Sequence, residues 1–118
     1  MVYEIYLLFL QLLEYMSLIE LNLHKIFELC KKYRVRDLSV FGSILTEQFN
    51  ENSDIDLLFN FEPHDPDSLE FDYFRNYWDL VDELEKLFGR SVDLIDEGAL
   101  RNKYFIANIN RTKQRIYG

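Results

Sequence analysis

The sequence predicts a single mixed α/β (α+β) domain, built as a short twisted sheet flanked by helices. Its 118 residues are 48% apolar and include ten Phe and eight Tyr, which is enough for one packed core with little room for a second. Apolar residues recur with helical spacing in residues 18–33 and 68–88, and short apolar runs bounded by turn residues indicate strands. We expect three aspartates on one face of the sheet and the helices on the other.

The first predicted helix of the domain covers residues 18–33, with Lys31 and Lys32 suited to its C-terminal end. Its apolar residues at helical spacing are Leu23, Ile26, Phe27 and Cys30. Cys30 is the single cysteine of the chain, so no internal disulfide can form. We interpret Cys30 as a buried helix residue. Because nothing points to an oxidising compartment, we expect a cytoplasmic protein.

Two predicted strands follow, joined by a short helix and a turn. The strand over residues 35–41 runs into Gly42-Ser43, after which residues 43–49 form the short helix and residues 50–53 the turn. The second strand covers residues 54–61. Its apolar run predicts a central strand that is covered on both faces beyond its first residues.

A polar loop over residues 62–68 separates these strands from a long helix. Ser68 is the predicted N-cap, and Gly89 ends the helix after Phe88. The expected core-facing residues of this helix are Phe74, Trp78, Val81, Leu84 and Phe88. A third strand over residues 91–95, a helix over 104–110 and a short strand over 115–117 complete the domain.

Residues 1–17 form an apolar N-terminal extension, ahead of the domain predicted at residues 18–118. The apolar run from Ile5 to Leu13 is shorter than the roughly 20 residues that span a bilayer. The segment also lacks the positive start and small cleavage-site residues of a signal peptide, so we expect no membrane partner. Two interpretations stay open: Met16 is the physiological start, or the segment is an apolar helix that packs on the domain or on a second copy.

The charge balance excludes one class of partner and leaves another open. The net charge of −8 at pH 7 argues against direct nucleic-acid binding, which needs clustered Lys and Arg against phosphates. A basic protein partner remains compatible with this charge. His24 and His64 have no partner at catalytic or metal-ligand spacing, so we expect both on the surface or in turns.

Gly42-Ser43 and Asp54-Ile55-Asp56 predict a metal-nucleotide site. Glycine lets the chain turn tightly and approach a ligand closely, and a helix starting at Ser43 would present free N–H groups to a phosphate. Asp54 and Asp56 lie two residues apart on a strand, so their side chains share a face with Cα atoms roughly 6.6 Å apart. Carboxylates some 5 Å apart repel by about 3 kcal/mol at an effective dielectric of about 20. A cation such as Mg²⁺ would remove that cost.

Nucleotidyl transfer by a pair of metal ions needs two or three carboxylates on adjacent strands. Asp93 lies on a strand of matching pattern, with Val92 and Leu94 facing the other way, and is the natural third carboxylate; Asp96 is its rival. Each piece also has a simpler explanation, namely a solvated strand face or an ordinary strand-to-helix turn. Together, in this order and on these elements, they favour the metal-nucleotide site.

The spacing Gly42-Ser43-x10-Asp54-x-Asp56 resembles the signature of the polymerase-beta-like nucleotidyltransferase superfamily. Three segments resemble its minimal nucleotidyltransferase (MNT) antitoxins, the MntA group, in particular. These segments are Leu38 to Ser43, Ser53 to Leu58, and Val92 to Ile95 followed by Leu100-Arg101-Asn102. The similarity covers roughly residues 18–118, whereas residues 1–15 depart from the usual pattern and take no function from it.

This resemblance implies an antitoxin that is paired with a HEPN-domain ribonuclease toxin and transfers AMP from ATP to a toxin tyrosine, using Mg²⁺. Asp54 and Asp56 would hold the metal ions, and Asp93 would complete the metal site and help to deprotonate the tyrosine. Gly42 and Ser43 would hold the triphosphate. The chain lacks room for the additional substrate domain of antibiotic-modifying relatives, which favours an acceptor carried on another protein.

Two alternatives to this function remain. One is an antitoxin that neutralises its toxin by binding alone, and the other is a nucleotidyltransferase acting on a small molecule. Basic residues for the triphosphate are also undecided. Lys103, Arg111 and Arg101 lie in the tail, and the simpler interpretation of all three is surface charge on a helix.

Overall fold

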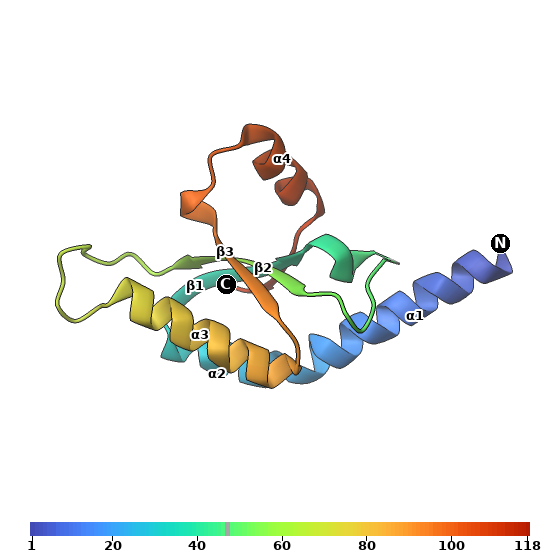
Figure 1. Ribbon diagram of the computed structural model, residues 1–118, viewed down its shortest axis with the longest axis horizontal. Coiled ribbons are helices and arrows are strands. Elements are labelled where there is room, and N and C mark those ends of the chain that lie inside the picture. The colour runs from blue at the N-terminus through green and yellow to red at the C-terminus, as the bar shows by residue number, and fades with distance from the viewer. Residues whose placement is uncertain (47) are drawn as a thin grey trace.

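A computed structural model of the chain describes residues 1–46 and 48–118. A four-stranded mixed sheet lies at its centre, in the strand order β3-β2-β1-β4. The strands are β1 (Val35–Phe41), β2 (Ile55–Phe61), β3 (Val92–Asp96) and β4 (Gln114–Tyr117). β2 is antiparallel to β1 and parallel to β3, and β4 pairs with the other edge of β1 in the antiparallel sense. The predicted short mixed sheet is therefore confirmed (Figure 1).

Two helices cover one face of the sheet, which we call the core face. They are α2 (Leu23–Lys32) and α3 (Tyr73–Phe88), and both lie below the sheet in Figure 1. The strand residues of the core face alternate with residues that point to the opposite face, as in any pleated strand. They include Leu38, Val40, Ile55, Leu57, Phe59 and Leu94, all of which are buried. Cys30 of α2 is also buried in this core, as predicted.

The opposite face, which we call the aspartate face, carries Asp56 on β2 and Asp93 on β3. It is covered in part by α4 (Lys103–Thr112), which lies above the sheet in Figure 1. Ile109 of α4 packs there on Phe41 and Leu58. The expectation that helices occupy only the face without aspartates is therefore wrong. The connection from β3 to β4 has to cross the sheet, and it crosses on the aspartate side.

Several predicted boundaries also change. α3 begins at Tyr73, where the Asp72 side chain accepts a hydrogen bond from the Arg75 N–H, so Ser68 is not its N-cap. Phe74 and Trp78 are 73% and 62% exposed, and Leu80 joins Val81, Leu84 and Phe88 as the buried stripe. Tyr73 and Tyr77 contact the sheet from the same part of α3, so Phe74 and Trp78 lie on the side of the helix that faces away from it. Gly89 ends α3 in the left-handed conformation, as predicted.

The segment after Gly42 is shorter than predicted. The 3₁₀ helix η2 (Gly42–Leu45) replaces the expected helix over residues 43–49, of which Glu47 lies outside the described residues. Two further 3₁₀ turns, η1 (Glu20–Asn22) and η3 (Glu97–Ala99), lead into α2 and out of β3.

The two histidines have different surroundings. His24 lies on the surface of α2, 2.9 Å from the Glu28 carboxylate, as expected for a surface residue. His64 lies in the loop before α3, but its ring stacks against Phe71 with centroids 4.3 Å apart. His64 is therefore a partly packed loop residue.

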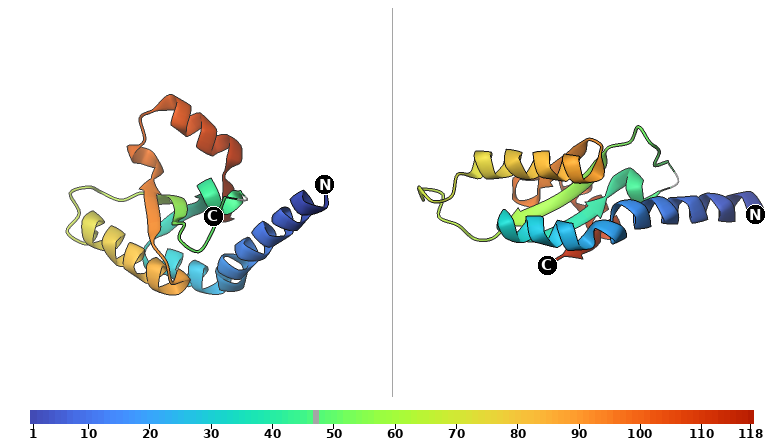
Figure 2. Two further views of the ribbon diagram at one scale, coloured as in Figure 1. Left: turned by 45° about the vertical axis from the view of Figure 1, so that its right-hand side comes forward. Right: turned by 90° about the horizontal axis from the view of Figure 1, so that it is seen from below.

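The N-terminal segment forms α1 (Val2–Leu18), whose free end extends well beyond the sheet (Figures 1 and 2). No residue of α1 is buried, although most are apolar. Together with η1 and α2 it forms a helical stretch, Val2–Lys32, that is long and apolar enough to cross a membrane by length and composition alone. The apolar run from Ile5 to Leu13 is too short to span a bilayer by itself, but the helix that contains it continues beyond Leu13.

Candidate active site

Asp56 and Asp93 are direct neighbours on adjacent strands. The parallel ladder between β2 and β3 pairs these two residues in register, and both side chains are on the aspartate face. Asp54 immediately precedes β2 and is exposed, so the strand holds Asp56 firmly and Asp54 more loosely. The structure thus places Asp56 and Asp93 side by side, with Asp54 two residues before Asp56 along the chain.

The pKa of the Asp56 carboxyl is shifted by its burial and by the carboxylates around it. Partial burial raises the pKa of the Asp56 carboxyl above its usual value, and the negative charges of Asp93 and Asp54 raise it further. A hydrogen bond from the Ser43 backbone N–H acts in the opposite direction. Burial and repulsion together outweigh this hydrogen bond, so the site favours a bound cation or proton.

Gly42 has a structural reason to be glycine. Its φ is +76°, in the left-handed region. A Cβ on Gly42 would come 2.3 Å from the Asp56 Oδ2 atom, which is much closer than two such atoms can approach. The turn after β1 therefore lies directly against the carboxylate pair, and Ser43 contributes its N–H there. A group bound by the carboxylates would touch this turn.

Asp96, the rival third carboxylate, lies elsewhere. Its side chain is on the core-face side of β3, where Oδ2 accepts a 2.5 Å hydrogen bond from the Tyr73 hydroxyl. Its Oδ1 accepts from the Gly98 N–H at 2.9 Å. Asp96 is therefore occupied in fixing the end of β3 to α3. The register of the parallel ladder favours Asp93 instead.

Two side chains hold the segments that flank the carboxylates. Arg90 donates to the carbonyl oxygens of Asn50 and Ser53, at 3.0 and 3.1 Å, and its guanidinium lies over the Phe49 ring. This fixes the loop that delivers Asp54. On the other side, the Gln11 amide of α1 donates to the Ile44 carbonyl at 2.9 Å. The middle of α1 is thereby tied to the turn that contains Gly42 and Ser43.

The donor chemistry of the three carboxylates suits a hard cation such as Mg²⁺, which prefers oxygen ligands and retains several waters. Among the described residues, no three His, Cys, Asp or Glu side chains are grouped closely enough to hold a metal ion. Asp54, Asp56 and Asp93 therefore share a face without enclosing a common point. The uncompensated charge on Asp56 is the observation that supports a fit.

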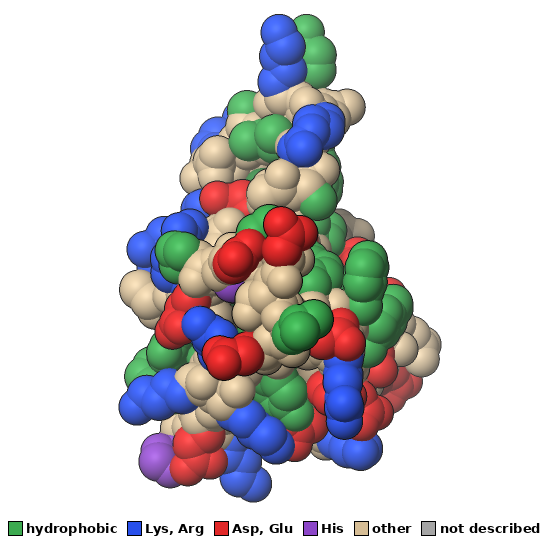
Figure 3. Space-filling model, turned by 90° about the vertical axis from the view of Figure 1, so that its left-hand side faces the viewer, with side chains coloured by type: hydrophobic (Ala, Val, Ile, Leu, Met, Phe, Trp, Pro, Cys, Tyr) green, Lys and Arg blue, Asp and Glu red, His purple; other side chains and the backbone are tan. Residues whose placement is uncertain are grey.

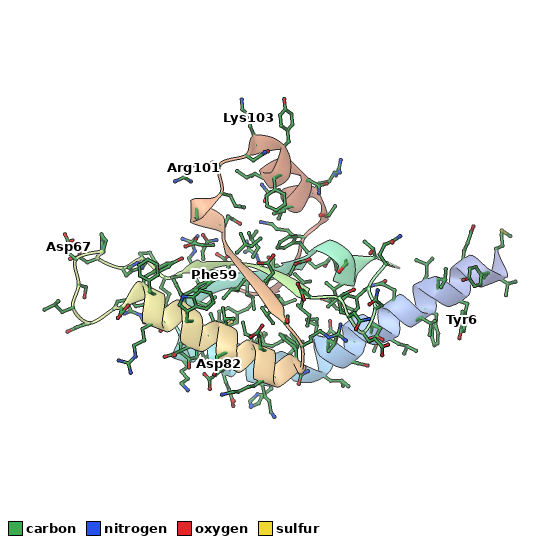
Figure 4. The ribbon with its side chains drawn as sticks, in the orientation of Figure 1. Tyr6, Phe59, Asp67, Asp82, Arg101 and Lys103 are labelled. Carbon is green, nitrogen blue, oxygen red and sulfur yellow. The ribbon has the colours of Figure 1, made fainter. Side chains whose placement is uncertain are left out.

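The basic residues of the tail do not point to the carboxylates. Arg101 donates to the carbonyls of Gly98 and Leu100, and Arg111 to the Asn108 side chain of its own helix. Lys103 and Arg101 lie at the outer side of α4 and its preceding loop (Figure 4). Lys and Arg side chains likewise occupy the top of the molecule in Figure 3. This arrangement favours the surface-charge interpretation.

A pocket next to the turn was not anticipated from the sequence. It has a volume of about 810 Å³ and lies between α1, η2 and α4, with Gly42 and Thr46 in its wall. Gln11 and Tyr15 contribute from α1, and Phe105 and Asn108 from α4. The spacing of Leu7, Gln11, Tyr15 and Leu18 on one face of α1, where each is partly buried, is the pattern that could have indicated this contact.

Comparison with known proteins assigns the class. The family model of the nucleotidyltransferase domain matches residues 23–116. The chain therefore belongs to the nucleotidyltransferase domain family, and α1 lies outside the matched region.

Two archaeal relatives are similar over most of the domain. The Thermococcus cleftensis protein adenylyltransferase MntA is 37% identical over 75 residues, which are 64% of this chain and 69% of that protein. A Methanocaldococcus jannaschii protein, provisionally named a protein adenylyltransferase, is 38% identical over 79 residues, or 67% of this chain and 74% of the relative. The resemblance to the MntA group is thus confirmed.

Solved structures share the fold. A minimal nucleotidyltransferase matches with a TM-score of 0.64 and 26% identity, over 80% of this chain and 89% of that one. A toxin–antitoxin structure with AMP-PNP matches at 0.62 and 21%, over 82% and 73% of the two chains. A third, of a tri-AMPylated Shewanella oneidensis HEPN toxin with its MNT antitoxin, matches at 0.58 and 20%, over 84% and 71%. At these identities the last two show the fold alone.

Proposed function

We propose that this chain is the antitoxin of a HEPN/MNT pair and acts as a protein adenylyltransferase. It moves AMP from Mg·ATP to a tyrosine hydroxyl of a HEPN-domain ribonuclease toxin and so silences the toxin, in the cytoplasm where ATP is available. The observation that carries this proposal is the in-register pair of Asp56 and Asp93 beside the Gly42-Ser43 turn. The relatives named protein adenylyltransferase and the toxin–antitoxin structures support the choice of acceptor.

The residues divide the reaction between them. Asp54 and Asp56 would hold a pair of Mg²⁺ ions, and the bound metal would neutralise charge on the reacting phosphate. Gly42 and Ser43 would hold the β- and γ-phosphates through backbone N–H groups. For this, the Ser43 N–H would stop donating its hydrogen bond to Asp56 and donate it to a phosphate oxygen instead.

Asp93 would orient the tyrosine hydroxyl and accept its proton. The tyrosine oxygen attacks the α-phosphorus, a new O–P bond forms, and the bond to the leaving pyrophosphate breaks. The pKa of the neighbouring Asp56 is raised by burial and by the charges of Asp93 and Asp54, which supports a proton-accepting role for this face.

The direct test incubates the protein with labelled ATP, Mg²⁺ and the toxin encoded with it. We expect the label on the toxin, and a toxin with its acceptor tyrosine changed to Phe should remain unlabelled. Asp54→Asn and Asp56→Asn should abolish transfer, whereas Asp67→Asn should not, because Asp67 is an exposed loop residue remote from the site (Figure 4). Equal labelling by Asp56→Asn and the unchanged protein would refute the mechanism.

A second candidate is neutralisation by binding alone. The net charge of −8 favours this function because it suits a basic protein partner, and the exposed apolar side chains of α1 offer a surface for an apolar contact with it. It predicts that Asp54→Asn/Asp56→Asn still protects cells from the toxin. The adenylylation function predicts that the same double variant fails to protect while still co-purifying with the toxin.

A further inference from the structure

The pocket between α1 and α4 opens beside the turn proposed to hold the phosphates. Gly42 is in its wall and is also the residue that lies against Asp56. A nucleotide whose phosphates lie on the Gly42-Ser43 turn therefore has the mouth of this pocket within reach of its remaining parts. At about 810 Å³ the pocket falls within the size range of small-molecule sites.

The chemistry of the pocket is suited to a neutral, flat, aromatic group. Phe41, Leu45, Phe105 and Ile109 supply apolar surface, and the Phe41 and Phe105 rings meet edge to face with centroids 6.4 Å apart. The polar lining consists of amides and hydroxyls, including Gln11, Asn108 and Gln114. Among the described residues that line it, the only charged one is Glu20. A pyrophosphate group would find no cation here, whereas a nucleobase would find both stacking surface and amide partners.

α1 lines the pocket with residues of its C-terminal half only, among the described residues. Gln11 and Tyr15 lie one helical turn apart on the same side of α1, so both face the pocket. The Gln11 Nε2 atom is fixed by its 2.9 Å bond to the Ile44 carbonyl, and the Gln11 Oε1 atom accepts no hydrogen bond from residues 1–46 or 48–118, so it can accept one from a ligand. α1 lies outside the region matched by the family model, so the match itself assigns no role to this wall.

We propose that α1 is part of the nucleotide site, and that the pocket between α1 and α4 binds the base of ATP. The inference rests on the proposed function for the presence of a nucleotide, and extends it by assigning the base-binding residues. Gln11 and Asn108 are the hydrogen-bonding side chains, and Phe105 supplies the apolar wall. The base is thus recognised partly by a helix that precedes the matched domain.

The same contact limits what else α1 can do. Because Gln11 is tied to Ile44, the part of α1 that precedes this contact is about ten residues long, or about 15 Å of helix at 1.5 Å per residue. A bilayer's hydrocarbon core is about 30 Å thick. A membrane-spanning α1 would therefore have to break its bond to the turn and empty the pocket wall.

The test compares ATP with tripolyphosphate, which carries the same phosphates without a base. Gln11→Ala and Asn108→Ala should weaken ATP binding to the purified protein about tenfold each, and leave tripolyphosphate binding unchanged within twofold. In transfer to the toxin, KM for ATP should rise while kcat stays within about twofold. The preference for ATP over CTP should fall in both variants.

Two exposed tyrosines serve as matched controls. Tyr6→Ala on the free half of α1 and Tyr104→Ala on the outer side of α4 should bind both ligands like the unchanged protein. Thermal unfolding of each variant identifies any that fails to fold. A fold-preserving Asn108→Asp supplies a second pocket variant, which should lose ATP affinity in the same way.

Three outcomes would overturn the inference. The first is an equal loss of ATP and tripolyphosphate affinity, which would mean that Gln11 acts only by positioning the turn. The second is unchanged ATP affinity and unchanged base preference. The third is a raised KM for the toxin alone, which would place the acceptor tyrosine in the pocket. If the unchanged protein binds ATP but transfers nothing, the proposed function fails, and the binding measurements still decide the base pocket.

Discussion

The two faces of the sheet contrast sharply in packing and charge. On the core face, Ile55, Leu57 and Phe59 are fully buried beneath α2 and α3. On the aspartate face, the same strand carries Asp56, which lies near Asp54 and beside Asp93 of β3. α4 covers only part of this face. One seven-residue strand thus supports stability through alternate residues and the candidate chemistry through the others. Substitutions of Ile55, Leu57 or Phe59 should therefore change stability, and substitution of Asp56 should change activity, whereas Leu58 on the aspartate face is buried under α4 and supports stability too.

The largest expected effect is on activity, on the aspartate face. Asp56→Asn should lower kcat for AMP transfer on the order of 10³-fold, about 4 kcal/mol of transition-state stabilisation. Its unfolding free energy should stay the same or rise, because the repulsion by Asp93 and Asp54 is removed. Steady-state kinetics with chemical denaturation would measure both. A marked loss of stability would contradict the division between the faces.

The matching change on the core face is Leu57→Ala, one residue further along β2. Leu57 is fully buried, so its truncation should cost about 3 kcal/mol of unfolding free energy. Phe105→Ala on the aspartate face should cost clearly less, because Phe105 is 39% exposed. Urea unfolding of the two variants gives the comparison, and equal losses would show that α4 closes a second core.

Ligand binding should act only through the aspartate face. Mg·ATP binds the folded site alone, so at 100 times its dissociation constant it should add about 2.7 kcal/mol to the unfolding free energy and raise Tm. The increase should be retained in a core-face variant such as Leu80→Ala and lost in Asp54→Asn/Asp56→Asn. A Tm that is the same with and without Mg·ATP would count against the nucleotide site.

Two glycines separate the cost of a left-handed backbone from the cost of a collision with Asp56. Gly42 and Gly89 both have left-handed backbones, with φ of +76° and +67°. Alanine in that conformation costs roughly 1–2 kcal/mol. Gly89→Ala should show only this cost, since nothing lies within 4 Å of its added Cβ. Gly42→Ala also collides with Asp56, so it should be less stable than Gly89→Ala and should lose transfer activity.

The smallest expected effect is a pH dependence. Because the pKa of folded Asp56 lies above its ordinary value of 3.8, the folded state binds this proton more tightly than the unfolded state. Its contribution to stability is therefore present at low pH and declines as the pH rises from 3.8 through the raised value. Unfolding free energies measured across this window without Mg²⁺ should show a steeper decline in the unchanged protein than in Asp56→Asn.

Local sequence patterns predicted much of the site. Glycine followed by serine after a strand, with two aspartates two residues apart, depends on turn chemistry and strand alternation, both of which are local properties. The end of α3 at Gly89 was predictable for the same reason. Its start was not, because Ser68 and Asp72 are both competent caps and the choice depends on where α3 meets the sheet.

Long-range geometry was harder to anticipate. The sequence left Asp93 and Asp96 as rivals, and only the strand pairing separates them: Asp93 is in register with Asp56, while Asp96 bonds to Tyr73 on the other side. The aromatic stripe of α3 was half wrong because two neighbouring stripes of apolar residues have helical spacing, and only packing shows which one faces the sheet. Tyr73 and Tyr77 contact the sheet, whereas Phe74 and Trp78 face away from it.

By itself, the sequence determined the elements, their alternation and the residue types of a metal-nucleotide site, because these follow from backbone preferences and spacing within a few residues. The tertiary structure alone decided that α4 crosses the aspartate face and that the middle of α1 is bonded to the Gly42-Ser43 turn. Both contacts join segments far apart in the chain. Their stability depends on surfaces that exist only once the sheet has formed.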